Sequence, residues 1–351
     1  MSSTKRAWIS TAALLLLIAV GAGAYLFRMH RPFGAASAGS PPSILSELPL
    51  DAPAVIYLDV AALRKLQGSP LAAILGLTDS GPHADRDYQD FVRDTGFDYT
   101  RDLDKTAIAL WPASLGTPSH GPDEERLLVV AEGRFDQRKI EAYALRSGKA
   151  SAHGAQSVYE MPGNPSVAFE FLSPTQIALA SGKEVDALPL PSNFPARDPE
   201  MQARLDRVAG APIFAVARTD NLPDSFYAGL RSSPQLESLA RSVQGVTLAG
   251  QPEGDLIKMS LDAECDTAKS AFEVGTLLDG FRMMGTLALS DPKTRHQMNR
   301  QQAAFLDAVI RKVKIAYQDR WVRLSLDLTP EMLGARSSVS STPPPPLRPN
   351  P

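Results

Sequence analysis

Few of the residues that build reactive centres occur in this chain of 351 residues. Its one cysteine, Cys265, excludes an internal disulfide and the zinc sites that are built from cysteine pairs. Cys265 is followed by Asp266 with no histidine nearby, so a structural role is predicted for its thiol. The five histidines do not pair at metal-ligand spacing; they are His30, His83, His120, His153 and His296. We therefore expect no metal and no cofactor.

An excess of charge of one sign is also missing. The chain has 36 basic and 39 acidic residues, a net charge of −3. Nucleic-acid-binding domains usually carry a strongly basic face. The balance therefore gives no support for a nucleic-acid partner.

Recognisable catalytic motifs are absent, with one apparent exception. The body has no Gly-x-Ser-x-Gly elbow and no phosphate-binding glycine loop. Asp94-Thr95-Gly96 spells the aspartic-protease signature, but that chemistry needs two carboxylates that share one proton. The other candidate, Asp79-Ser80-Gly81, is too close in sequence to belong to a second lobe. A helix that ends at Gly96 explains the letters better, and no catalytic residue is predicted.

Four aspartates follow that predicted helix. Asp94, Asp98, Asp102 and Asp104 offer oxygen ligands that calcium prefers. The glycine and glutamate of an EF-hand loop are out of register, however. We therefore predict turn and helix-capping roles, with calcium binding as the alternative.

A long hydrophobic run is present at residues 7–27, and no charge interrupts it. As a helix it would extend ~31 Å, enough to cross the ~30 Å hydrocarbon core of a bilayer. Trp8 and Tyr25 stand near its ends, where aromatic rings favour the interface. The run is longer than the apolar part of a signal peptide, although cleavage after Ala24 is an alternative. A transmembrane anchor is predicted, with membrane lipid as its partner.

The orientation of this anchor rests on its flanks. Lys5 and Arg6 precede it like the basic start of an export signal, and residues 28–47 are rich in Pro, Ala, Ser and Gly, like a tether. We expect a cytoplasmic N-terminus and an extracytoplasmic body, which is the periplasmic side in a Gram-negative cell. The alternative is an adaptor that faces the cytoplasm.

The body alternates strand and helix patterns in an order that recurs. Ala52–Leu63 aligns with Ala211–Leu222, and Val129–Ala142 with Met259–Phe272. Asp136 is expected to cap a helix that runs to about Arg146. A long helix is expected from Asp266 to about Leu289, with apolar residues at helical spacing on one side: Ala271, Val274, Leu278, Phe281 and Ala288. The order suits a split-βαβ unit. The prediction is an α+β fold with a tandem of two split-βαβ (ferredoxin-like) repeats and antiparallel sheets, although any α+β chain can match itself to some degree.

These patterns divide the chain into seven segments. They are a short tail at 1–6, the anchor at 7–27, the tether at 28–47, the first repeat at 48–191, a connecting helix at 192–210, the second repeat at 211–331 and a Pro-rich disordered tail at 332–351.

The segment Ser69–Thr106 is longer than a simple βαβ crossover needs and mixes Gly, Pro and Asp with aromatic residues. We predict a partner surface there, with core filling as the alternative. The candidate contacts are Tyr88, Phe91, Phe97, Tyr99 and Trp111.

Two phrases resemble a known group of proteins: LPLDAPAVIYLDVAAL at 48–63 and FVRDTGFDYTRDLDKTAIAL at 91–110. They are similar to an uncharacterised bacterial family of single-pass membrane-anchored proteins with an extracytoplasmic α+β body. The resemblance implies anchorage and assigns no functional residue. The resulting hypothesis is a binding or scaffold module with a protein or peptide partner. The alternative is a hydrolase-type enzyme whose site is assembled only in three dimensions.

Overall fold

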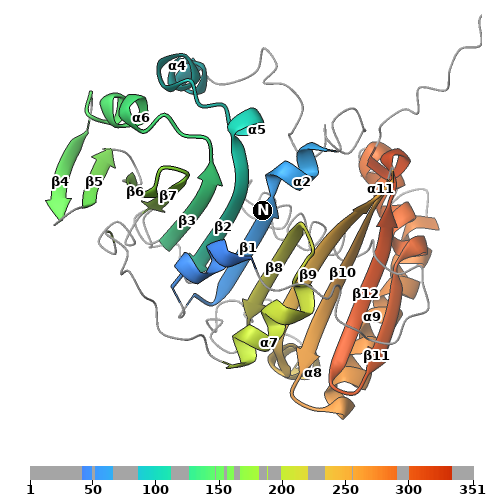
Figure 1. Cartoon of the computed structure of the whole chain (residues 1–351). Coiled ribbons are helices and arrows are strands. Elements are labelled where there is room, and N and C mark those ends of the chain that lie inside the picture. The colour runs from blue at the N-terminus through green and yellow to red at the C-terminus, as the bar shows by residue number, and fades with distance from the viewer. Residues whose placement is uncertain are drawn as a thin grey trace, which may run out of the picture.

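A single twelve-stranded sheet organises the molecule, with neighbouring strands in the order β11-β12-β10-β9-β8-β1-β2-β3-β7-β6-β5-β4 (Figure 1). The computed structural model describes residues 42–49, 52–65, 86–111, 126–146, 148–153, 156–161, 167–181, 188, 199–219, 234–254, 256–290 and 300–333.

The first wing of the sheet extends from the centre to β4. Its strands are β1 (Ala54–Asp59), β2 (Leu103–Trp111), β3 (Arg126–Gly133), β4 (Lys149–His153), β5 (Gln156–Met161), β6 (Val167–Ser173) and β7 (Gln176–Ser181). Its helices are the 3-10 helix η1 (Ser43–Glu47) and α2 (Val60–Arg64), α4 (Arg86–Thr95), α5 (Tyr99–Asp102) and α6 (Gln137–Ala144).

The second wing extends from the centre to β11. Its strands are β8 (Ile213–Arg218), β9 (Val243–Glu253), β10 (Leu256–Cys265), β11 (Lys314–Gln318) and β12 (Trp321–Leu328). Its helices are α7 (Pro199–Val208), α8 (Pro234–Arg241), α9 (Ala268–Ser290) and α11 (Arg300–Lys312), and the 3-10 helix η5 (Pro330–Leu333).

The α+β class and the antiparallel pairing are confirmed, but the split-βαβ arrangement is wrong. A split-βαβ unit joins parallel strands through a helix. The pairings between the described strands are antiparallel throughout, and β1, β2 and β3 lie side by side as a meander. The two wings also share one sheet, because β1 pairs with β8 at the centre. Local patterns specify strands and helices, whereas the choice of partner strand depends on contacts between distant residues.

Local signals account for several element ends. The Asp136 side chain accepts a hydrogen bond from the Lys139 amide and begins α6, as predicted. Between β11 and β12, Asp319 has a positive φ of 52° in the tight turn that fits a β-hairpin. These polar residues satisfy or redirect the backbone where regular hydrogen bonding stops.

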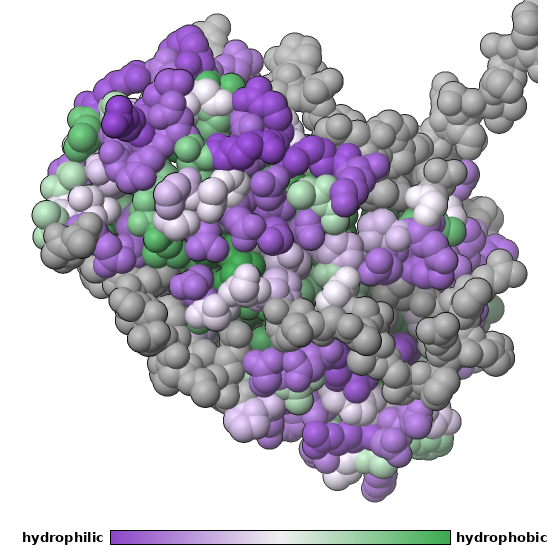
Figure 2. Space-filling model, viewed as in Figure 1, coloured by the Kyte–Doolittle hydropathy of each residue, from purple (hydrophilic) through white to green (hydrophobic). Residues whose placement is uncertain are grey.

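Helices cover both faces of the sheet. On one face, η1 and α7 pack over the centre, where Leu45 and Leu205 join Val55 and Phe214 in the largest core. On the opposite face lie α2 and α6 on the first wing and α9 and α11 on the second. Strand side chains alternate between faces, so each wing needs helical cover to bury both apolar sets. The face seen in Figure 2 is mainly hydrophilic, with small separate apolar areas.

Two predicted segment boundaries are wrong. Residues 43–47 form η1 rather than tether, and Ile44, Leu45 and Leu48 are fully buried in the central core. Met332, placed in the disordered tail, is buried beside Val309 of α11. In both cases isolated apolar side chains beside Pro- or Ser-rich sequence find a core that composition does not reveal.

The predicted anchor at 7–27 lies outside the described residues. Among the helices that are described, none combines the length and hydropathy needed to cross a bilayer.

Candidate functional site

The five aromatic residues predicted as partner contacts lie in two different places. Tyr88, Phe91, Phe97 and Tyr99 gather around α4 and α5, whereas Trp111 packs against the central core from the end of β2. The rings of Phe91 and Phe97 have centroids 6.3 Å apart and those of Tyr88 and Tyr99 5.4 Å.

These rings also contact the rest of the first wing. Phe91 meets Tyr143 of α6 edge-on, with ring centroids 5.3 Å apart, and Phe97 stacks on Phe135 at 5.0 Å. Tyr99 is exposed at 40%, and the other rings are half-buried. Mutual packing accounts for most of this group, which favours the core-filling interpretation over a partner surface.

The predicted capping role is confirmed for Asp98, whereas Asp94 lies in the last turn of α4 and Asp104 lies in β2. The helix ends at Thr95, and Gly96 has a positive φ of 74° and donates to the Val92 carbonyl. Asp98 caps α5 through the Thr100 amide at 2.9 Å. Asp94 is bonded by Arg93 and Arg146. The protease-like letters are therefore a helix end, and the carboxylate is held by guanidinium groups.

Acid should destabilise this region, because hydrogen bonds from Arg101 hold the pKa of Asp102 below its usual range. The unfolded state then binds protons more readily than the folded state. The stabilisation is complete above the unfolded pKa of ~3.9 and is lost as pH falls through the lower folded pKa. We expect Asp102→Asn to weaken folding at neutral pH and to flatten the acid limb of a plot of unfolding free energy against pH. An unchanged acid limb would exclude this role.

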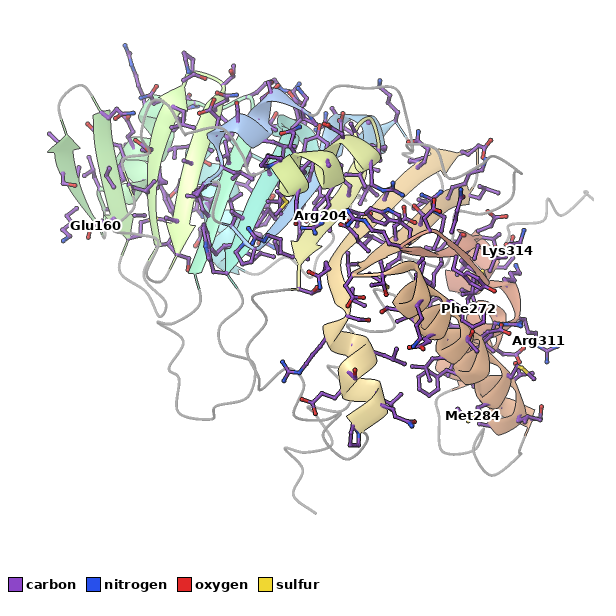
Figure 3. All side chains as sticks on the ribbon, turned by 90° about the horizontal axis from the view of Figure 1, so that it is seen from below. Glu160, Arg204, Phe272, Met284, Arg311 and Lys314 are labelled. Atoms are coloured by element: carbon purple, nitrogen blue, oxygen red, sulfur yellow. The ribbon has the colours of Figure 1, made fainter. Side chains whose placement is uncertain are left out.

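A second charged cluster joins α7 to the sheet. Arg204 Nε donates to Glu264 Oε2 at 2.8 Å, and both side chains are more than 90% buried. Arg320 approaches the other oxygen of Glu264 at 2.5 Å. Figure 3 shows Arg204 near the middle of the molecule, where α7 meets the strands. A β-carbon at Gly245 would lie 2.5 Å from Arg204 Nε, so the small residue leaves room for the guanidinium.

The neighbouring carboxylate, Asp262, is engaged in the same way. It accepts a hydrogen bond from Arg207 at 3.2 Å. Two nitrogens of Arg323 also donate to its two oxygens. The Arg207 guanidinium stacks 3.8 Å from the centroid of the Trp321 ring. Because each of the two carboxylates already accepts from two guanidinium groups, neither is available as a general base. The cluster therefore has a structural role, in which it holds α7 against β10.

Sequence reasoning missed this cluster. Its members are 60 or so residues apart, as the separations of Arg204 from Glu264 and of Arg323 from Asp262 show. One signal was available, since β10 alternates polar residues with the apolar Ile257, Met259 and Ala263. Within the described ranges, no three His, Cys, Asp or Glu side chains are placed to hold a metal ion.

The surface feature that sequence reasoning did not identify is the outward side of α9. Ala271, Val274 and Leu289 of this 23-residue helix are buried toward the sheet. Further large apolar side chains of the helix remain between 45% and 73% exposed; they are Phe272, Phe281, Met283, Met284 and Leu287. We call these five residues the α9 stripe. Figure 3 shows Phe272 and Met284 along α9, at the end of the molecule opposite Glu160.

Charge is scarce along the α9 stripe. Between Thr276 and Ser290 the helix carries only Asp279 and Arg282, which bond to each other at 2.8 Å. The periodicity places Phe281 on the buried side of the predicted helix, but it is 45% exposed. Several large apolar side chains exposed on one helix often mark an interaction site.

Surface hollows lie on both wings of the sheet. One, of about 820 Å³, lies between α9, α11 and β11 and is lined by Asp279, Arg282, Arg311 and Lys314, among others. The other, of about 840 Å³, lies over the start of α6 beside Arg134, Arg138 and Glu141. Arg282 and Arg311 in the first hollow are bonded to Asp279 and Asp307. The buried Oδ1 atom of Asp327, which also lines this hollow, has no hydrogen-bond partner among the described residues.

Comparison with known proteins yields solved structures only. No protein-family model and no curated protein matches the chain. Crystal form III of TP0453 aligns with a TM-score of 0.45 at 12% identity, over 86% of this chain and 98% of that one. Crystal form I of TP0453 aligns with a TM-score of 0.43 at 11% identity, over 86% and 96%.

Proposed function

We propose that this chain is a non-enzymatic protein-binding or scaffold module, held at a membrane by residues 7–27 with its body outside the cytoplasm. The observation that carries the binding role is the α9 stripe. Burying exposed apolar area is worth about 25 cal/mol per Å², so the exposed Phe, Met and Leu side chains of one helix favour association. Methionine side chains adapt their shape to a partner surface, and two of them lie in this stripe.

A hydrolase has less support. Its site would need a carboxylate, histidine or nucleophile that is free to transfer a proton or attack a substrate. The most buried acidic cluster, around Asp262 and Glu264, is saturated by arginines. Burial, with Asp266 and Glu264 nearby, raises the pKa of the Cys265 thiol to about 11, which makes it a poor nucleophile at neutral pH.

A tandem duplication is the finer part of the fold proposal. The order β1-β2-β3-β7-β6 on the first wing corresponds to β8-β9-β10-β12-β11 on the second. In each wing a helix follows the third strand of the meander: α6, with eight residues, and α9, with 23. This correspondence supports a common origin. It also supports assigning the binding role to the second wing, where the equivalent helix has become long and apolar on its outward side.

Site-specific photo-crosslinking in cells would test the binding role. A photoreactive phenylalanine analogue would replace Met283 in the full-length chain. The matched control carries the same analogue at Leu145, which is 52% exposed on the other wing. We expect light-dependent protein adducts at position 283 and far fewer at 145. Equal yields at the two positions would contradict the assignment of the stripe as a binding surface.

A further inference from the structure

The edge of the second wing combines three features. β11 is the last described strand on its side of the sheet. Its Tyr317 is 50% exposed and meets Phe272 of the α9 stripe edge-on, with ring centroids 5.2 Å apart. Gly275 backs onto Tyr317 so closely that a β-carbon there would lie 2.8 Å from the ring. The helix thus lies directly over the edge strand, and its apolar stripe continues from that edge.

An edge strand presents backbone groups that can pair with another strand. Strand pairing of this kind already occurs within the chain, since β1 and β8 pair in antiparallel orientation and so join the two wings. β11 has neither a proline nor a bulge to discourage pairing. A strand that paired with β11 would also contact α9. The exposed apolar side chains of α9 would add the apolar contact area that strand pairing alone lacks.

We propose that a second copy of this chain docks here, through antiparallel pairing of β11 with β11 and contact between the two α9 stripes. The proposal rests on the binding role assigned above and names the partner. It forms a two-fold, isologous interface, in which each copy contributes the same surface.

The sequence of β11 is complementary to itself. In an antiparallel pairing centred on Ala316, Lys314 of one copy lies opposite Gln318 of the other, and Ile315 lies opposite Tyr317. Like charges directly opposite each other would destabilise such a pair, and this register has none. Ile315 and Tyr317 lie on the α9 side of the sheet, so these apolar pairs lie beneath the helices.

Covering the whole stripe and Tyr317 would bury an area at the lower limit for a stable dimer. The stripe and Tyr317 together offer six large side chains, each about half to three-quarters exposed. They correspond to roughly 600 Å² per copy, because a large aromatic side chain presents 150–250 Å². Two copies would bury roughly 1,200 Å², the lower end of the range for specific protein interfaces.

Disulfide trapping tests the pairing directly. The only native cysteine is buried, so an introduced cysteine is the one accessible thiol. With the dyad at residue 316, two Ala316→Cys residues would have Cα atoms ~4.5–5.5 Å apart, within disulfide range. The control is Ala150→Cys on β4, the strand at the opposite edge. In full-length chain purified in mild detergent, we expect roughly tenfold or more faster covalent dimerisation at 316 than at 150. Equal rates would overturn the proposal.

A charge exchange tests the register. Gln318→Lys would place lysine opposite Lys314 twice per dimer and weaken the dimer roughly two- to thirtyfold. Adding Lys314→Glu would turn both contacts into opposite-charge pairs and restore association. Both variants change solvent-exposed side chains, so folding is retained and is checked by circular dichroism. Sedimentation that shows no weakening, or no rescue, would contradict this register.

The outcomes also separate the two proposals. Adducts at position 283 with another protein, together with no dimer at position 316, would overturn the second copy as partner and leave the binding role in place. Failure at both positions would overturn both.

Discussion

Replacing Arg204 with alanine is expected to lower the free energy of unfolding by about 3–5 kcal/mol, because it leaves the Glu264 carboxylate buried without its buried partner. Arg204 is 3% exposed and Glu264 7%, so little water reaches the vacated position. Arg320 still contacts Glu264, but its side chain is 55% exposed and cannot replace a buried donor. Chemical denaturation of the full-length chain in mild detergent, followed by circular dichroism, measures the change.

The matched control is Arg241→Ala. Arg241 bonds to Glu237 within α8 at 2.9 Å, but its side chain is 43% exposed. Such i,i+4 pairs at a helix surface contribute only ~0.3–0.5 kcal/mol. If Arg204→Ala lowered the free energy of unfolding no more than Arg241→Ala does, the cluster between α7 and β10 would not stabilise the fold as proposed.

Phe214→Ala is expected to cost about 3–5 kcal/mol and to weaken both wings together. Phe214 on β8 is 1% exposed and stacks on Tyr57 of β1, with ring centroids 4.9 Å apart. These strands form the seam between the wings, and Tyr57 lies directly opposite Phe214 in the register. The central core continues across this seam, with Leu128 on one side and Ala249 on the other.

Unfolding should therefore remain a single transition in the variant, shifted to lower denaturant concentration. Leu145→Ala, at a position that is 52% exposed, serves as the control and should change stability by less than about 0.5 kcal/mol. Two separate transitions in the native chain would show that the wings fold independently, contrary to a shared core.

Local sequence signals predicted most of the elements. The strands around Val55, Val129 and Val167 and the hairpin after Val313 show runs or alternations of apolar residues that do not depend on distant partners. Helix ends were predicted where a capping side chain or a glycine acts on its own backbone, as at Asp136 and Gly96. One edge strand, β4, has the weakly patterned sequence Lys-Ala-Ser-Ala-His and was not predicted.

The pairing order was beyond such signals. The alternation of strand and helix is the same in a split-βαβ unit and in a meander followed by a hairpin, so local patterns cannot separate the two. The antiparallel seam between β1 and β8 brings together residues that are about 160 positions apart. The pairing of Arg204 with Glu264 depends likewise on α7 lying across the strand ends.

The candidate binding surface was likewise predicted only in part from the sequence. Periodicity predicted that a long apolar helix follows Asp266, and α9 spans Ala268–Ser290. Periodicity predicted one buried side, which is confirmed for Ala271 and Val274 and wrong for Phe281. Apolar residues occur around the whole helix, so the pattern did not show that a second apolar side stays exposed. The positions of β11, β12 and α11 leave Phe272, Met283 and Leu287 more than half exposed.

The sequence by itself determined the α+β class, the positions of most strands and helices and the shortage of reactive side chains, because these depend on composition and on hydrogen bonds and periodicities within a few residues. The tertiary structure decided the single antiparallel sheet, the buried arginine–carboxylate cluster and the exposed side of α9. Each of these depends on which distant segments fill the space next to one another.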